Sequence, residues 1–333
     1  MTNRRSNVPA PDPTDPESAV EIAAAVRTRG VSAREMVERA LDRIDATEER
    51  LNAFVHIAGD QARKDADEID AAVGRGEEVG SLAGVPFGVK DMDQCAGMPV
   101  TYGSLIHKNR APMSEDSVHI GRLRAAGAIP VGMTSCSEFG TVHFTHTKAW
   151  GTTRNPWNLD LTPGGSSGGS GATVAAGVVP FATAGDGGGS TRIPAAFSGL
   201  VGMKPSYGRI PREEPSTSQT AVWGALTRTV SDAARHLDVT SGPDDRDRTS
   251  LPPAGLSYER LENETHEGKT GIQWPCPEPD HPGTKFLHEN GILRGKGLFV
   301  PVEYRESMEL EDDEYGLLLS TGRTLYHYNA ATQ

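Results

Sequence analysis

The stretch Thr162-Pro-Gly-Gly-Ser-Ser-Gly-Gly-Ser170 sets two adjacent serines among glycines, and Asp186-Gly-Gly-Gly-Ser-Thr-Arg192 adds a second glycine run that ends in a serine. An apolar segment without a charged residue, 172–185, separates the two. Glycine loses more backbone entropy on folding than any other residue, so this density serves a geometric need. Either the backbone approaches another group closely here, or several N–H groups converge on one point.

Three known arrangements contain such runs. Gly164-x-Ser166-x-Gly168 matches the nucleophile elbow of α/β-hydrolases, but an elbow follows a hydrophobic strand and residues 158–163 do not have that pattern. A phosphate-binding loop fits less well, because no lysine follows the glycines. A flexible Gly/Ser linker is the plain alternative, although an uncharged apolar segment and a second glycine cluster do not normally follow a linker.

A further interpretation combines the serines with a lysine, because serine needs a base to act as a nucleophile. Lys90 is the candidate, since it follows an apolar strand predicted at 85–89 and precedes Asp91. Desolvation would lower the pKa of a lysine buried there, whereas most lysines that follow a strand are simply solvated. The histidines of this half have no recognisable triad context and are expected to be satisfied or exposed: His107, His119, His143 and His146.

Length and charge limit the remaining classes of protein. A chain of 333 residues fits one large or two ordinary domains, and a net charge of −12 argues against a nucleic-acid surface. Cys95, Cys136 and Cys276 are odd in number and far apart, so neither a disulfide framework nor a zinc-binding pair is expected. No secretory signal or membrane-spanning run is recognisable. We therefore expect a soluble cytoplasmic protein without membrane contact, metal or other cofactor.

Apolar periodicity and capping signals favour an α/β fold. Strands that alternate with helices imply a mixed or parallel sheet with helices on both faces. The first helix is predicted to begin at a capping box of Thr14 and Glu17, the second at one of Ser32 and Glu35, and the last at Ser231. Further helices are predicted at 59–73, 117–126 and 172–179, and further strands at 128–133, 181–184, 198–203 and 225–230.

Taken together, the motifs resemble the amidase signature family over residues 15–260. Pro86-Phe-Gly-Val-Lys-Asp91 resembles its lysine segment. Gly151-Thr-Thr-Arg-Asn-Pro-Trp157, the two glycine–serine stretches and Arg192-Ile-Pro-Ala195 resemble its signature, and Ser166 and Ser190 have the separation of the family's serine pair. The resemblance implies the amidase-signature fold, a mixed β-sheet flanked by helices.

The resemblance also implies a role for each residue of the site. Ser190 would be the acyl nucleophile, Ser166 the bridging serine that follows a cis peptide bond at Gly165, and Lys90 the base. Asp186 and Arg192 would fix the second glycine loop. The backbone N–H groups expected to hold the tetrahedral oxyanion are those of Gly187, Gly188, Gly189 and Ser190.

Beyond about residue 261 the sequence departs from this family. Gly271-Ile-Gln-Trp-Pro-Cys276 and Arg294-Gly-Lys-Gly297 resemble the catalytic subunit of molybdopterin-dependent formate dehydrogenases, without its metal-ligating parts. We expect a disordered arm at 1–14, a partial amidase domain at 15–260 and a dehydrogenase-like fragment at 261–333 that is not an independent domain.

These expectations lead to one main function and two alternatives. The main one is an amidase that hydrolyses a small carboxamide to a carboxylate and ammonia or an amine. The alternatives are the amidase subunit of a tRNA-dependent amidotransferase and an inactive chimeric or truncated product. A truncated sheet is expected to expose an edge that allows self-association. The sequence does not identify the amide.

Overall fold

The computed structural model of this chain describes residues 18–213, 218, 220–252, 265–266 and 269–270. The described residues up to 252 belong to one unit. A second unit contains the short antiparallel pair β9 (Thr265–His266) and β10 (Lys269–Thr270). The arm predicted at 1–14 and almost all of the dehydrogenase-like segment predicted at 261–333 lie outside the described residues.

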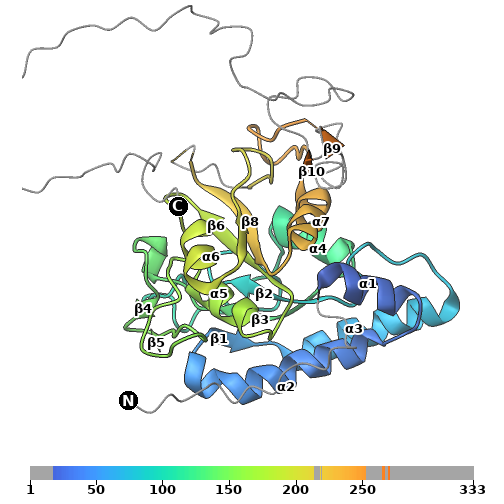
Figure 1. Cartoon of the computed structure of the whole chain (residues 1–333), viewed down its shortest axis with the longest axis horizontal. Helices are drawn as coiled ribbons and strands as arrows, with labels where there is room; N and C mark the ends of the chain where they lie inside the picture. Colours follow the sequence, from blue (N-terminus) through green and yellow to red (C-terminus); the bar gives the residue numbers. More distant parts are fainter. Residues whose placement is uncertain (1–17, 214–217, 219, 253–264, 267–268, 271–333) are drawn as a thin grey trace, which may run out of the picture. The chain divides into compact units, whose positions relative to one another are not determined.

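A six-stranded mixed sheet forms the centre of the first unit, in the order β1-β3-β2-β6-β8-β7 (Figure 1). β3, β2 and β6 run parallel, whereas β1, β8 and β7 are antiparallel to their neighbours. The carboxyl ends of β2 and β6 therefore meet at one edge, where the strands end in Lys90 and Asp186. The strands span Phe54–Ile57 (β1), Pro86–Lys90 (β2), Ile129–Thr134 (β3), Phe181–Asp186 (β6), Val201–Met203 (β7) and Val222–Thr227 (β8).

Seven α-helices of the described residues surround this sheet, which confirms the predicted α/β fold. None of them combines the length and the apolar character needed to cross a bilayer. The helices span Ala19–Arg27 (α1), Ala33–Leu51 (α2), Gly59–Arg75 (α3), Val118–Ala125 (α4), Gly168–Ala175 (α5), Arg192–Ser198 (α6) and Val230–Thr240 (α7). The loops contain a 3-10 turn at Glu138–Gly140 (η1) and the pair β4 (His146–Thr147) and β5 (Gly151–Thr152).

Side-chain alternation along the strands assigns the helices to opposite faces of the sheet. A Cβ atom at Gly88 would lie 3.3 Å from Ala182 and 3.7 Å from Thr173 of α5, so this face packs against α5. The rings of Phe87 and Phe181 stack on the other face, with centroids 5.1 Å apart. There Phe181 meets His236 of α7, with ring centroids 6.1 Å apart.

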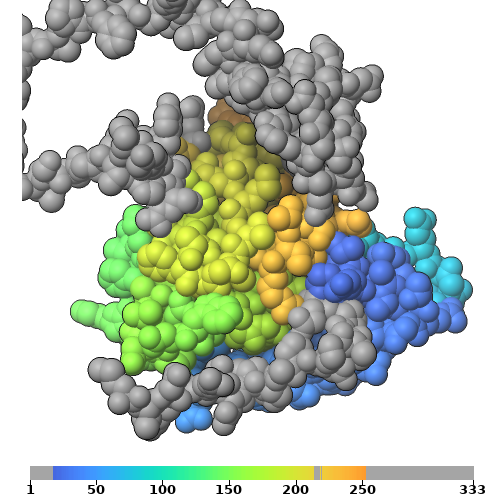
Figure 2. All heavy atoms as spheres, in the orientation of Figure 1, coloured from blue at the N-terminus to red at the C-terminus, as the bar shows by residue number. Residues whose placement is uncertain are grey.

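The N-terminal helices pack on this core and on one another. α2 and α3 lie side by side (Figure 1), and Arg63 of α3 forms an ion pair with Glu38 of α2. Figure 2 shows the blue residues of α1 directly against the orange residues of α7. This contact includes a hydrogen bond of 3.1 Å from the Val20 N–H to Asp232 Oδ1, which joins the beginning of the described chain to its last helix.

The capping predictions were confirmed at one helix and wrong at two others. Ser32 and Glu35 form the capping box of α2, as predicted. The capping box of α1 is formed by Ser18 with Glu21, not by Thr14 with Glu17. Two consecutive S/T-x-x-E patterns occur in this region, 14–17 and 18–21, and only the second begins the buried apolar face of Ala19 and Ile22. α7 is capped by Thr229 instead of Ser231, because the Thr229 side chain accepts the Asp232 N–H.

The helix predicted at 172–179 begins and ends earlier in the chain than predicted. α5 begins at Gly168, inside the first glycine cluster, and ends at Ala175. Glycine is a poor helix former, so propensity places the start later. Tertiary packing overrides it, because Gly169 lies against the backbone of Ala53 and Ser135 with no room for a side chain. β1 and α6 were not predicted at all.

Candidate active site

Lys90 is buried at the carboxyl end of β2, where only 2% of the residue is exposed. Its Nζ lies 2.8 Å from Ser166 Oγ, and its backbone N–H donates to Thr183 Oγ1 on β6. Burial lowers the pKa of Lys90 to about 8, because a charged ammonium loses its hydration there. The side chain therefore has a substantial neutral fraction near physiological pH, as the sequence hypothesis of a buried base requires.

Ser166 stands just before α5 and follows a cis peptide bond from Gly165, the bond that the family resemblance implies. Its carbonyl oxygen accepts the N–H of Ser137, at 3.1 Å. A Cβ atom on Gly165 would lie 2.7 Å from Phe144 N, closer than side chains come to backbone atoms. Glycine is therefore required at 165 because the loop around Phe144 crosses it closely.

The second glycine run brings Ser190 to the same place. The Ser167 N–H donates to the Ser190 carbonyl at 3.3 Å, so the two glycine–serine stretches contact each other directly. Ser190 is 6% exposed, whereas Gly187 and Gly188 are exposed. The run thus forms a loop whose outer part faces solvent while its serine lies near the buried lysine and serine pair.

Asp186 and Arg192 hold this loop in shape. The Arg192 guanidinium donates twice to the Asp186 carboxylate, with both distances 2.9 Å. The same carboxylate accepts the N–H groups of Gly189 and Thr191, at 2.8 Å and 3.2 Å. Burial alone would raise the pKa of Asp186, but the Arg192 pair and these N–H bonds hold it below its ordinary value. These contacts fit the structural role expected for both residues.

The N–H of Gly189 is thus directed at Asp186 and is not free to bind an oxyanion. From the sequence alone, the N–H groups of residues 187–190 were all expected to bind the oxyanion. Gly189 differs because its N–H donates to the buried Asp186 carboxylate, and its φ of 109° lies in a backbone region that favours glycine. The remaining candidates for the oxyanion are the N–H groups of Gly187, Gly188 and Ser190.

The family model described as Amidase matches residues 35–286. The chain belongs to the amidase family. A glutamyl-tRNA(Gln) amidotransferase component from Synechococcus sp. (strain RCC307) is 44% identical over 251 residues, which are 74% of this chain and 52% of that protein. The same component from Geobacillus kaustophilus is 42% identical over 235 residues, which are 70% of this chain and 48% of that protein.

Solved structures of this family share the fold. A bacterial aryl acylamidase of the amidase signature family superposes with a TM-score of 0.69 at 38% identity, over 72% of this chain and 51% of that one. The peptide amidase from Stenotrophomonas maltophilia gives a TM-score of 0.66 at 30% identity, over 73% and 51%. This amidase-family chain spans about half the length of the curated relatives it matches.

Polar groups that were not among the predicted site residues support Lys90 from the core of this family member. Thr183 Oγ1 accepts the Lys90 N–H, and the Thr183 carbonyl accepts the hydroxyl of Ser170, at 2.8 Å. Ser170 in turn lies 2.7 Å from Thr134 Oγ1 on β3. Threonine and serine in apolar strands and helices carry no sequence signal of such a role, so only the fold reveals it.

Asp91 fixes the loop that follows Lys90. Its carboxylate accepts the N–H groups of Thr101 and Gly103 and the Thr101 hydroxyl. Burial raises the pKa of Asp91 in spite of these hydrogen bonds. Among the residues described, no group of three His, Cys, Asp or Glu side chains is arranged to hold a metal ion.

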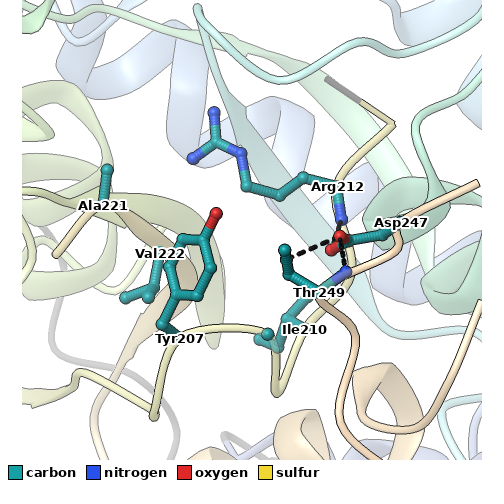
Figure 3. Close-up of a pocket in the computed structure, with 8 residues that line it drawn as sticks. Tyr207, Ile210, Arg212, Ala221, Val222, Asp247 and Thr249 are labelled. Carbon is teal, nitrogen blue, oxygen red and sulfur yellow. Dashed lines mark hydrogen bonds between the residues drawn. The ribbon is translucent and has the colours of Figure 1, made fainter. Parts of the chain in front are cut away.

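Arg212 places a positive charge near Lys90, and its guanidinium packs on the ring of Trp223. Its guanidinium carbon lies 4.7 Å from the centre of the Trp223 ring, and its backbone N–H donates to Asp247 at 2.9 Å. Figure 3 shows the guanidinium extending away from Asp247. The Arg212 charge acts on Lys90, whose pKa it helps to lower after burial has made the largest contribution.

Proposed function

We propose that this chain cleaves an amide bond through an acyl-enzyme, with Ser190 as nucleophile, Ser166 as relay and Lys90 as base. One observation carries the proposal: the buried Lys90 Nζ lies 2.8 Å from Ser166 Oγ. Burial leaves this lysine with a pKa of about 8, near the pH at which a general base is most effective. A lone buried lysine would have no such partner.

Each proton transfer has a donor and an acceptor. Neutral Lys90 takes the Ser166 proton as Ser166 takes that of Ser190, whose Oγ attacks the amide carbonyl. The N–H groups of Gly187, Gly188 and Ser190 stabilise the tetrahedral oxyanion. When the C–N bond breaks, Ser166 returns a proton to the leaving amine, and Lys90 returns one to Ser166. Water then hydrolyses the ester at Ser190 by the same route.

A fluorophosphonate probe tests this proposal, because it reacts with an activated serine and marks it. We expect one adduct, at Ser190, that is lost in Lys90→Ala. Lys108→Ala is the control, since Lys108 is exposed, donates to the Ala149 carbonyl at 2.8 Å, lies over the Trp150 ring and has no part in the proposed reaction. Absence of labelling in well-folded protein would contradict the proposal and favour the inactive chimeric product.

The amidase subunit of a tRNA-dependent amidotransferase is the second candidate. Relatives with 41–44% identity to this chain are named as a component of glutamyl-tRNA(Gln) amidotransferase, a higher identity than that of the aryl acylamidase and the peptide amidase. This favours the amidotransferase component over a stand-alone amidase. Ammonia release from glutamine should then depend on added partner proteins of such an enzyme. Release of ammonia from simple carboxamides by the isolated chain would favour the stand-alone amidase instead.

A further inference from the structure

A second buried polar cluster lies beside the proposed site and is not used by the proposed reaction. It consists of Asp93 in the turn after β2, Ser117 at the N-cap of α4, His119 on α4 and His236 on α7. Each of the four is at most 5% exposed. Asp93 accepts the Ser117 hydroxyl at 2.6 Å and lies 2.7 Å from His119 Nδ1. His119 Nε2 lies 2.8 Å from His236 Nε2.

The hydrogen bonds determine where the charge resides. Both Asp93 oxygens accept, the pattern of an ionised carboxylate, so His119 carries a proton on Nδ1. Burial, together with the neighbouring His119, lowers the pKa of His236 well below its ordinary value, so His236 is neutral. The two histidine rings share a hydrogen bond of 2.8 Å between their Nε2 atoms, and His236 is its neutral member. The acidic member of this cluster (the Asp93–His119–His236 chain) is the Asp93 carboxylate, which acts on Lys90 as a negative charge.

Two sets of contacts connect this cluster with Lys90. The Asp93 N–H donates to the Lys90 carbonyl at 2.8 Å, so the turn that follows Lys90 is anchored by the Asp93 side chain. The His119 ring also stacks on Trp223, with centroids 6.1 Å apart. A Cβ atom at Gly185 would lie 3.0 Å from Cζ3 of Trp223 and 3.7 Å from Lys90 Nζ, so Trp223 and the lysine both lie next to this glycine.

We propose that Asp93, held by Ser117 and by the two histidines, is a positioning residue for Lys90 and that its charge sets the pH range in which this lysine is neutral. The inference rests on the proposed role of Lys90 as base. The chain through His119 and His236 ties Asp93 to two helices, α4 and α7, so that the turn after β2 cannot shift independently of them.

The sign of the effect follows from the charges that face Lys90. Asp186 on β6 and Asp93 favour the protonated lysine, whereas Arg212 disfavours it. Cys136, which follows β3, stays a neutral thiol at these pH values, because burial raises its pKa. Removing the Asp93 charge should therefore lower the pKa of Lys90. One buried negative charge at this range is equivalent to about one pH unit.

Asp93→Asn tests the inference, with Asp232→Asn as matched control. Asp232 is equally buried, on α7, but is not among the charges that act on Lys90. Competitive acetylation with peptide mapping measures the pKa of Lys90 without catalysis, and the acid limb of fluorophosphonate labelling at Ser190 measures it through the chemistry. We expect both midpoints to move down by about one pH unit in Asp93→Asn and to stay in place in Asp232→Asn.

Asn at 93 cannot accept from both donors as a carboxylate does, so this variant could fold poorly. The triple variant Asp93→Leu, His119→Leu, His236→Leu removes the whole chain, and such apolar replacements of buried polar networks are often neutral or stabilising. It should show the same shift. Folded variants whose acetylation midpoint at Lys90 equals that of wild type would overturn the inference, whether or not Ser190 is labelled. Unlabelled wild type would instead overturn the proposed function alone.

Discussion

Two buried polar clusters adjoin the end of β2, the Lys90–Ser166–Ser190 site and the Asp93–His119–His236 chain. Lys90 and Asp93 are three residues apart, and both are almost without solvent exposure. They differ in their surroundings. The first ends in a glycine loop whose outer residues, Gly187 and Gly188, are exposed. The second is enclosed by α4, α7 and the rings of Trp223 and Phe181.

Because of this difference in surroundings, burial has a different effect in each cluster. In the first cluster, burial lowers the pKa of Lys90, the proposed base, while the outer residues of the glycine loop face solvent. In the second, burial immobilises the polar groups, and every donor has an acceptor within the cluster. A buried network with an open side can do chemistry, whereas a closed one can only hold or polarise its neighbour.

The largest expected effect comes from removing Ser166, the proposed relay of the first, open cluster. Ser166→Ala takes away the hydroxyl 2.8 Å from Lys90 Nζ and should slow fluorophosphonate labelling of Ser190 by about 10³-fold, as loss of one member of a catalytic triad does. Ser231→Ala on α7 is the control. If Ser166→Ala labelled at the wild-type rate, the open cluster would have no relay and the comparison would fail.

Acidification should have a smaller effect on the labelling rate than Ser166→Ala has, and it should affect the first cluster but not the second. Lys90 must be neutral to accept a proton, and its pKa is about 8, so it is increasingly protonated as the pH falls. The labelling rate should drop about tenfold per pH unit below 8, or about 100-fold at pH 6. His236 should stay neutral over the same range in a ¹⁵N NMR titration, because burial lowers its pKa. A labelling rate that is flat down to pH 6 contradicts this prediction.

Breaking the Asp186–Arg192 ion pair, which shapes the glycine loop, should lower both the free energy of unfolding and the rate of fluorophosphonate labelling. Asp186→Asn weakens the bidentate bond from Arg192 and the N–H bonds of the loop. Because the Arg192 side chain is 23% exposed, we expect a loss of about 2 kcal/mol in the free energy of unfolding, less than for a fully buried pair. Urea denaturation measures it, with the exposed Asp45→Asn as control. Unchanged stability would show that the loop holds its shape without Asp186.

The smallest expected effect concerns the backbone of Lys90. Thr183→Val keeps the side-chain shape but leaves the Lys90 N–H without its 2.9 Å acceptor, which should cost about 1 kcal/mol in the free energy of unfolding. Thr183→Ser keeps the hydroxyl and is the control. Equal denaturation midpoints for the two variants would mean that another acceptor replaces Thr183.

Local signals predicted much of this architecture. The capping box of Ser32 and Glu35 is a short-range pattern, and α2 begins where it stands. The two glycine–serine stretches predicted either a close approach of the backbone to another group or a convergence of N–H groups, and the structure shows a close approach, in which the Ser167 N–H donates to the Ser190 carbonyl. Lys90 was identified because an apolar strand precedes it. In each case the deciding interaction lies within a few residues or within a motif long enough to specify its own geometry.

The closed cluster could not be predicted, because its members are ordinary residues brought together only by the fold. Asp93 and His119 are 26 positions apart, and His119 and His236 are 117 apart. His119 was expected to be a satisfied or exposed histidine, and it is a satisfied one. Similarly, the N–H of Gly189 could not be told from that of Gly188 until the position of Asp186 was known.

The hydrogen bond from the Val20 N–H to Asp232 has a consequence for biosynthesis. Its two ends are 212 positions apart, so the docking site of α1 on α7 does not exist when α1 leaves the ribosome. At about 5–20 residues per second, the interval is about 10 to 40 seconds. Through that time the apolar face of α1, with Ile22 and Val26, lacks its contact with α7. Nascent α1 is therefore a natural segment for a chaperone to shield until α7 has been translated.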